Sequence, residues 1–229
     1  MDYLSLIKPR MVLGNLLIAA AAFLLASPTI YWQQLEVMLA GLGLVIAGGC
    51  ALNNWYDRAI DSKMARTATR VLPAGRIAPR RALVFGVLLV VIGFAILWFT
   101  NPYALGAAVA GAAFYLLFYT PLKHHSGISL FVGAVAGATP PLVGYAAAAG
   151  HFDTLAWILF GGVYLWQLPH FIAISLYRFD EYAAAGVPLL VTGAPHSAAG
   201  RTAARATFFA SLIVLMGASL AVIIFRLAL

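Results

Sequence analysis

ALNNWYDRAIDSKMARTATRVLPAGRIAPRR is the sequence from Ala51 to Arg81, and it separates two long apolar runs. This segment contains seven of the 14 Lys and Arg residues of the chain, namely Arg58, Lys63, Arg66, Arg70, Arg76, Arg80 and Arg81. It also contains two of only seven acidic residues, Asp57 and Asp61. Paired carboxylates beside a cluster of cations indicate a loop that handles an anion through a metal ion.

The composition around this loop is that of a membrane protein. The chain has 229 residues, of which 63% are hydrophobic and 9% charged, and its mean hydropathy is +0.95. A soluble domain carries roughly 25% charged residues. The net charge of +7 could suggest a nucleic-acid partner, but the cations lie in short loops between apolar runs. We therefore expect membrane lipid around the chain and no nucleic-acid partner.

Seven apolar stretches are candidates for membrane-spanning helices, because a helix needs about 20 residues to cross the hydrocarbon core. They are Met11–Ser27, Leu35–Leu52, Ala82–Thr100, Tyr103–Leu122, Ile128–Ala149, Leu155–Leu176 and Ala206–Phe225. No boundary between domains is visible. The sequence predicts an all-α fold, a polytopic transmembrane helix bundle of about seven helices forming one domain over residues 1–229.

The positions of the charges predict the orientation of this bundle. If the N-terminus is cytoplasmic, 13 of the 14 Lys and Arg residues fall on the cytoplasmic side, and Arg226 alone falls on the other. Positive charge is retained on the cytoplasmic side of membrane proteins. We therefore expect a cytoplasmic functional face.

Asn53, Asp57 and Asp61 follow one another at intervals of four residues, at the cytoplasmic end of the second predicted helix. Residues four apart share one face of a helix. Mg²⁺ binds one or two carboxylates and completes its shell with water and phosphate oxygens. The spacing predicts a Mg²⁺ site, and the alternative is a solvated helix end whose carboxylates pair with Arg58 or Lys63.

Lys63, Arg66 and Arg70 follow the carboxylates and could bind the phosphate groups of a diphosphate. An Arg side chain binds phosphate oxygens in a fork, and Lys binds them as a point charge. The alternative is that these cations only set the topology or contact anionic lipid head groups, which is the interpretation we prefer for Arg80 and Arg81.

The segments NNWYDRAID (Asn53–Asp61) and RTATRVLPAGRI (Arg66–Ile77) resemble the UbiA-type intramembrane prenyltransferase superfamily. Within it, WQLPHF (Trp166–Phe171) resembles the protohaem IX farnesyltransferase (haem O synthase) family, as do GATPPLVGY (Gly137–Tyr145) and RFDEYAAAGVPL (Arg178–Leu189). The resemblance spans roughly residues 3–190.

This resemblance implies a reaction. A Mg²⁺-bound farnesyl diphosphate would ionise, and a vinyl group of haem B would capture the allylic cation to give haem O for terminal oxidase biogenesis. It implies a bacterial inner-membrane location and, as partners, other haem-biosynthesis or oxidase-assembly membrane proteins.

The resemblance also implies roles for particular residues, which fall into four groups. The expected catalytic residues are Asp57, Asp61, Arg66 and Arg70, and the expected metal ligands are Asn53, Asp57, Asp61, Asp180 and Glu181. Diphosphate would be bound by Lys63, Arg66, Arg70, Lys123 and Arg178, and haem by Trp166, Gln167, His170 and His125.

The family normally has nine transmembrane helices, whereas seven are expected here. This leaves three alternatives to a haem-modifying enzyme. One is a prenyltransferase for a quinone precursor such as 4-hydroxybenzoate, against which the Trp166–Phe171 motif argues. Another is a truncated, non-catalytic protein that binds haem or lipid. The third is a transporter, which would place charges at mid-membrane, whereas this chain keeps nearly all of them at one interface.

Overall fold

The computed structural model describes residues 2–27, 29–190 and 197–228, and the regular elements in this part of the chain are all helices. Seven segments are long and apolar enough to cross a membrane. They are α2 (Pro9–Ala26), α3 (Trp32–Asp61), α4 (Pro79–Leu97), the continuous segment of α5 (Pro102–Ala113), η1 (Phe114–Tyr119) and α6 (Thr120–Leu122), then α7 (Ser129–Ala149), α8 (Thr154–Tyr177) and α10 (Ala198–Ala228). This confirms the predicted all-α integral membrane protein with seven candidate spans.

Two of the helices extend well beyond the apolar runs from which they were predicted. The second predicted helix, Leu35–Leu52, lies within α3, which begins at Trp32 and ends at Asp61. The last one, Ala206–Phe225, lies within α10, where the guanidinium of Arg205 lies over the rings of Tyr177 and Phe209. Both helices continue through polar residues because the side chains of these residues contact neighbouring segments. The length of an apolar run cannot predict such contacts.

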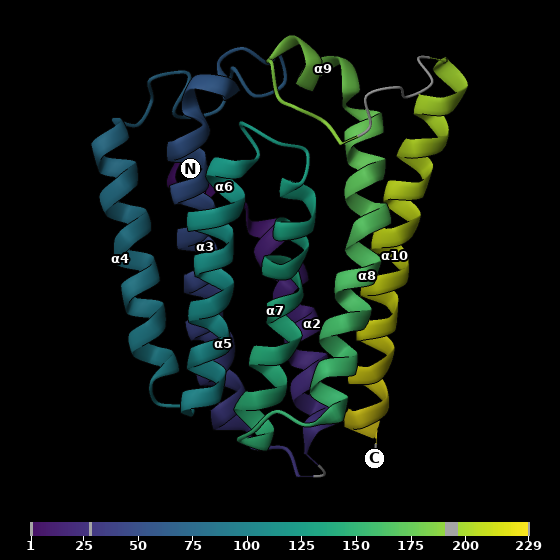
Figure 1. Ribbon diagram of the computed structural model, residues 1–229. Coiled ribbons are helices and arrows are strands. Elements are labelled where there is room, and N and C mark those ends of the chain that lie inside the picture. Colours follow the sequence, from purple (N-terminus) through teal and green to yellow (C-terminus); the bar gives the residue numbers. More distant parts are fainter. Residues whose placement is uncertain (1, 28, 191–196, 229) are drawn as a thin grey trace.

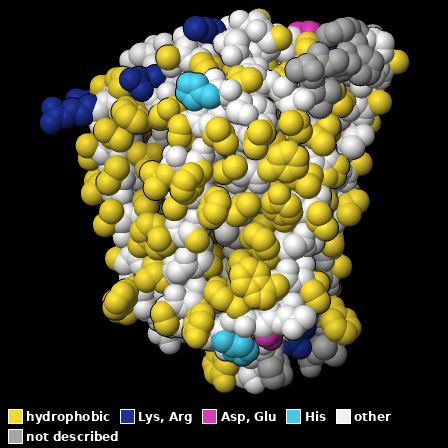
Figure 2. Space-filling model, viewed as in Figure 1, with side chains coloured by type: hydrophobic (Ala, Val, Ile, Leu, Met, Phe, Trp, Pro, Cys, Tyr) yellow, Lys and Arg dark blue, Asp and Glu magenta, His cyan; other side chains and the backbone are white. Residues whose placement is uncertain are grey.

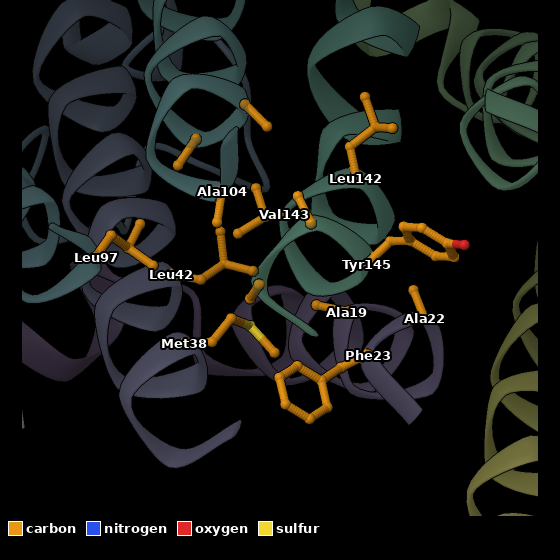
Figure 3. Close-up of a cluster of buried hydrophobic side chains, with 14 of the residues drawn as sticks. Ala19, Ala22, Phe23, Met38, Leu42, Leu97, Ala104, Leu142, Val143 and Tyr145 are labelled. Atoms are coloured by element: carbon orange, nitrogen blue, oxygen red, sulfur yellow. The ribbon is translucent and has the colours of Figure 1, made fainter. Parts of the chain in front are cut away.

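The spans run up and down beside one another, with α7 inside the bundle and α10 at its edge beside α8 and α2 (Figure 1). Among the spans, α7 is the most buried and α10 the least. The main apolar core joins Phe23 of α2, Met38 and Leu42 of α3, and Leu142 and Val143 of α7 (Figure 3). These residues lie toward the end of the bundle where α2 ends and α3 begins.

The opposite end carries most of the charge, and we refer to it as the charged end. It is formed by the short helix α1 (Asp2–Leu6), residues 62–78, residues 123–128 and the short helix α9 (Phe179–Ala184) (Figure 1). On the face shown in Figure 2, Lys and Arg side chains gather there above a broad hydrophobic band. Arg226 lies at the other end, where its guanidinium donates to the carbonyl oxygens of Leu24 and Ser27.

Glycines let α3 and α4 approach until their backbones touch. Gly41 and Gly48 lie two turns apart on α3, and they face Gly93 and Gly86 of α4. A Cβ at Gly48 would lie 2.6 Å from the carbonyl oxygen of Gly86, and one at Gly93 would lie 2.7 Å from that of Gly41. Small residues allow such close packing in membranes. This contact holds α3, and with it Asn53, Asp57 and Asp61, at a fixed position in the bundle.

We predict that Gly93→Ala destabilises the protein by about 1–3 kcal/mol, because the added methyl group is forced against backbone atoms of α3. The measurement is thermal unfolding of the detergent-solubilised protein. Gly106→Ala in α5 is the matched control, since a Cβ there meets nothing within 4 Å and Ala is the better helix former. Equal melting temperatures for Gly93→Ala and Gly106→Ala would contradict the prediction.

Candidate functional site

The polar face of α3 is buried at the charged end of the bundle. Asn53, Asp57 and Asp61 lie on this face and are only 4%, 7% and 3% exposed. A carboxylate removed from water is costly unless a charged or hydrogen-bonding partner compensates for it. The surrounding segments supply such partners to each of the three side chains.

Asp57 is paired with residues that follow α6. The ammonium of Lys123 forms an ion pair with Oδ2 of Asp57, and His124 Nε2 lies 2.9 Å from Oδ1. The same ammonium lies over the ring of Tyr119, at 5.4 Å from its centroid. The sequence predicted roles for Lys123 and His125. Lys123 does contact the carboxylate of Asp57, but the neighbouring histidine that contacts it is His124.

Asp61 is paired with Arg70 of the following loop. Arg70 Nη1 lies 3.0 Å and 2.8 Å from the two carboxylate oxygens of Asp61. The loop has one polar and one apolar anchor. The Thr67 hydroxyl donates to the backbone carbonyl oxygen of Asp61, and Val71 and Leu72 pack against Leu6 of α1. Residues 62–78 therefore form a fixed structure over the end of α3.

Asn53 connects three segments that are distant in the sequence. Its Oδ1 accepts a hydrogen bond of 3.2 Å from Lys8, and its Nδ2 donates to the hydroxyl of Thr120 at 3.2 Å. That hydroxyl donates in turn to the carbonyl oxygen of Tyr115 in the π-helix η1. Pro121 has no N–H to continue the helical ladder here, and π-helical turns are frequent at functional sites.

Lys8, Thr120 and His124 are the site residues that the sequence analysis did not assign. Lys8 precedes a proline at the start of a helix, and the other two flank an apolar helix end. Nothing in their local pattern distinguishes them from residues that set topology. Only the packing of α2, α3 and η1 brings them to the polar face of α3.

The acidic residues of α9 have separate partners. Glu181 accepts a bond of 2.9 Å from Arg66 and one of 2.7 Å from Arg178, so it bridges the loop after α3 to the end of α8. Burial raises the pKa of Glu181, but the hydrogen bonds from Arg66 and Arg178 outweigh this and hold the pKa below its ordinary value. The side chain of Asp180 is 72% exposed and lies 3.8 Å from Arg201 of α10. Lys63 is exposed on the loop.

The donors on α3 are hard oxygen ligands of the kind that Mg²⁺ prefers. Within residues 2–27, 29–190 and 197–228, no three His, Cys, Asp or Glu side chains come together to form a metal site by themselves. Mg²⁺ usually takes one or two carboxylates and receives its other oxygens from water and bound phosphate. Asn53, Asp57 and Asp61 therefore fit a magnesium ion that arrives with a phosphate ligand.

The expected haem-binding residues of α8 lie between α7 and α10. The indole N–H of Trp166 donates to the carbonyl oxygen of Ser211, and His170 Nδ1 lies 2.8 Å from the Ser211 hydroxyl. Gln167 is buried, and its amide lies where a Cβ on Gly137 would be, so Gly137 makes room for it. Trp166 and His170 are stacked, whereas His125 lines a separate apolar groove of about 390 Å³ with Phe118 and Val132.

A cleft of about 180 Å³ lies beside Asp61 and Arg70, on the side of α3 that faces α1. Asn54 lines this cleft and donates to the carbonyl oxygen of Leu6. The side-chain oxygen of Asn54, Oδ1, is buried and has no hydrogen-bond partner in the described part of the chain. Such an atom requires a donor from a water molecule or a bound group.

Several curated bacterial proteins are similar to this chain. The chain is 46% identical over 191 residues to "Protoheme IX farnesyltransferase 2" of Chromobacterium violaceum, an alignment that covers 82% of this chain and 63% of that protein. It is 44% identical over 192 residues to "Protoheme IX farnesyltransferase" of Cronobacter sakazakii, covering 82% and 65%. The chain thus spans less than two thirds of the length of these relatives.

Solved structures share the fold at lower identity. A UbiA homolog from Archaeoglobus fulgidus bound to DMAPP and Mg²⁺ has a TM-score of 0.74 at 16% identity, covering all of this chain and 85% of that one. The apo structure of a UbiA homolog from Aeropyrum pernix K1 has a TM-score of 0.70 at 23% identity, covering 91% and 79%.

The family assignment rests on a match that covers most of the chain. The model of the UbiA prenyltransferase family matches residues 15–229, which include α3, the loop that follows it, and α8. The polar face of α3, the cations around it and the helical bundle agree with this match. The chain belongs to the UbiA prenyltransferase family.

Proposed function

We propose that this chain transfers a farnesyl group from farnesyl diphosphate to a vinyl group of haem B, in a Mg²⁺-dependent reaction that gives haem O. The observation that carries this proposal is the buried set of carboxylates and cations at the charged end, which suits a metal–diphosphate ligand. The names of the relatives, both protohaem IX farnesyltransferases, support haem as the acceptor.

Asn53, Asp57 and Asp61 are the residues that we propose hold Mg²⁺, with Glu181, the less exposed of the two acids of α9, as a candidate ligand of a second metal. When bound, the metal would neutralise negative charge on the departing diphosphate. The Archaeoglobus fulgidus homolog, whose structure was solved with DMAPP and Mg²⁺, supports the pairing of this ion with a prenyl diphosphate. Asp180 stays a prediction with less geometric support, since it is exposed and near Arg201.

The cations of the site are paired with its own carboxylates. Lys123 is paired with Asp57, Arg70 with Asp61, and Arg66 with Glu181. We propose that the pairs exchange partners: the carboxylates turn to the metal, and the cations turn to the phosphate oxygens. Arg66, Arg70, Lys123 and Arg178 then stabilise the diphosphate as it leaves with the electron pair of the broken carbon–oxygen bond.

The acceptor step forms a carbon–carbon bond. The terminal vinyl carbon of haem bonds to the farnesyl carbon that has lost the diphosphate, and water then adds to the inner vinyl carbon and releases a proton. An apolar bundle protects the allylic cation from earlier capture by water. We propose that the amide of Gln167 and the Nε2 atom of His170 contact the haem, since His170 Nδ1 faces the Ser211 hydroxyl. Trp166 would contact it with its ring, since the indole N–H is bonded to Ser211. His125 would contact it from the apolar groove that it lines.

We propose that residues 1–229 act as one prenyltransferase-like domain in the bacterial inner membrane, with the charged end in the cytoplasm. The concentration of Lys and Arg at this end supports the orientation. Farnesyl diphosphate and haem B would be the partners in the reaction. Haem-biosynthesis or oxidase-assembly membrane proteins would be the protein partners.

Purified protein incubated with haem B, farnesyl diphosphate and Mg²⁺ is expected to yield haem that has gained one farnesyl group and one hydroxyl group, measured by mass spectrometry. Asp57→Asn is expected to lower kcat/KM by roughly 100-fold or more, since it removes the charge that faces the metal. Glu36→Gln is the matched control, because Glu36 is an exposed acid at the other end of α3.

The acceptor is tested in the same assay by replacing haem B with 4-hydroxybenzoate. Prenylation of 4-hydroxybenzoate but not of haem would identify a quinone-precursor enzyme. Bound haem with no change of mass would indicate a haem-binding protein instead. Full activity in Asp57→Asn would contradict the metal assignment even if haem is the acceptor.

The bridge made by Glu181 predicts a pH dependence of stability. The folded-state pKa of Glu181 lies below its ordinary value of 4.5, so the bridge stabilises the fold fully above that pH and is lost as the pH falls through the folded-state pKa. Glu181→Gln should therefore cost about 1 kcal/mol or less at neutral pH and nothing in strong acid. Melting temperatures at both pH values measure this, and Asp180→Asn serves as the control. A difference that persists in acid would exclude the ionised bridge as its cause.

A further inference from the structure

Lys8 has a backbone conformation that its neighbours must impose. Its φ is 51° and its ψ is 64°, and it is the one non-glycine residue with positive φ among those described. Left-handed backbone is unfavourable for a side chain with a Cβ, and a residue before proline ordinarily adopts an extended conformation. Strain of this kind persists only where the surrounding structure holds it, and it is concentrated at functional sites.

The contacts on both sides of Lys8 explain how the strain is maintained. On one side, Leu6 is buried against Ala51, Val71 and Leu72, and its carbonyl oxygen accepts a hydrogen bond of 2.9 Å from Asn54. On the other side, Pro9 begins the membrane-spanning helix α2. The left-handed turn directs the ammonium of Lys8 to Asn53, on the polar face of α3.

The ammonium of Lys8 differs in its partners from the other cations of the site. Arg66, Arg70, Lys123 and Arg178 each form an ion pair with a carboxylate. Lys8 donates to the neutral amide oxygen of Asn53, and none of the ion pairs formed among the described residues includes it.

We infer that Lys8 binds the diphosphate directly, as a cation that the N-terminal segment carries into the site and that no carboxylate of the site neutralises. This inference rests on the diphosphate step of the proposed function and not on the identity of the acceptor. An ammonium has three N–H donors, and the bond to Asn53 uses one of them. The others are available to phosphate oxygens beside the ion that Asn53 and Asp57 would hold.

The packing of α1 connects Lys8 to the site in a second way. Leu6 packs on Val71 and Leu72, and these residues follow Arg70 in the loop. The positions of Lys8 and Arg70 are therefore linked through one small apolar cluster. A ligand held by both cations would be bound between the N-terminal segment and the loop after α3.

The experiment is a calorimetric titration of the detergent-solubilised full chain with inorganic pyrophosphate, with and without Mg²⁺. Lys8→Met is expected to weaken pyrophosphate binding roughly 10- to 100-fold, the usual effect of losing a charged hydrogen bond, in both conditions. Lys8→Arg should retain most of the affinity. Arg10→Met is the matched control, because Arg10 is an exposed cation two residues further along the chain.

A role limited to positioning Asn53 would give a different result. Lys8→Met would then weaken binding only when Mg²⁺ is present, and it would have no added effect in the background of Asn53→Ala. That outcome would overturn the inference. The inference would also be overturned if Lys8→Met kept wild-type affinity, or if the wild-type chain did not bind pyrophosphate. Failure to farnesylate haem B, with pyrophosphate binding still dependent on Lys8, contradicts the proposed acceptor and leaves the inference standing.

A second measurement needs no variant, in case Lys8→Met fails to fold. The rate of acetylation of Lys8 by an amine-reactive reagent is followed by mass spectrometry on the wild-type protein. Pyrophosphate is expected to slow this rate severalfold relative to sulfate at equal ionic strength. An unchanged rate at saturating pyrophosphate would overturn the inference.

Discussion

The burial of Asp57 and Asp61 is the constraint on which the rest of the charged end depends. A carboxylate in a largely dehydrated environment must be compensated, and breaking a buried ion pair by removing one partner commonly costs 3–5 kcal/mol. Lys123 and Arg70 provide this compensation from two different loops. The two loops are therefore positioned by the same charges that we propose bind substrate, and these ion pairs help to hold this end of the bundle together.

That arrangement requires α3 to be fixed along its whole length, and the two ends of the helix are fixed in different ways. Near its start, Met38 and Leu42 lie in the main apolar core, and Gly41 lies against the backbone of α4. Near its end the apolar cluster is smaller, with Ala51 against Leu6 and Val71. There, Asn54 and Asp61 are held by hydrogen bonds to α1 and to the loop. Apolar packing thus positions the helix, and polar contacts complete the site at its end.

The spans and the composition of the site could be predicted from the sequence because they depend on local properties. Apolar run length identifies the helices, and the four-residue spacing of Asn53, Asp57 and Asp61 puts them on one face. The partners of these residues could not be predicted. Lys8 is 45 residues from Asn53, and His124 is 67 residues from Asp57, so only the packing of distant helices brings them together. The ends of α3 and α10 were missed for the same reason.

The charged groups at the end of α3 carry an excess of positive charge. Among the described residues, the four cations Arg66, Arg70, Lys123 and Arg178 pair with three carboxylates, those of Asp57, Asp61 and Glu181. Lys8 adds a fifth positive charge, which is bonded to the amide oxygen of Asn53. A divalent cation entering alone would add to this excess of positive charge and would compete with Lys123 and Arg70 for the same oxygens. In the reaction that we propose, a diphosphate would draw those cations away and free the carboxylates at the same time. On this proposal, the ion pairs favour joint binding of metal and diphosphate over binding of the metal alone.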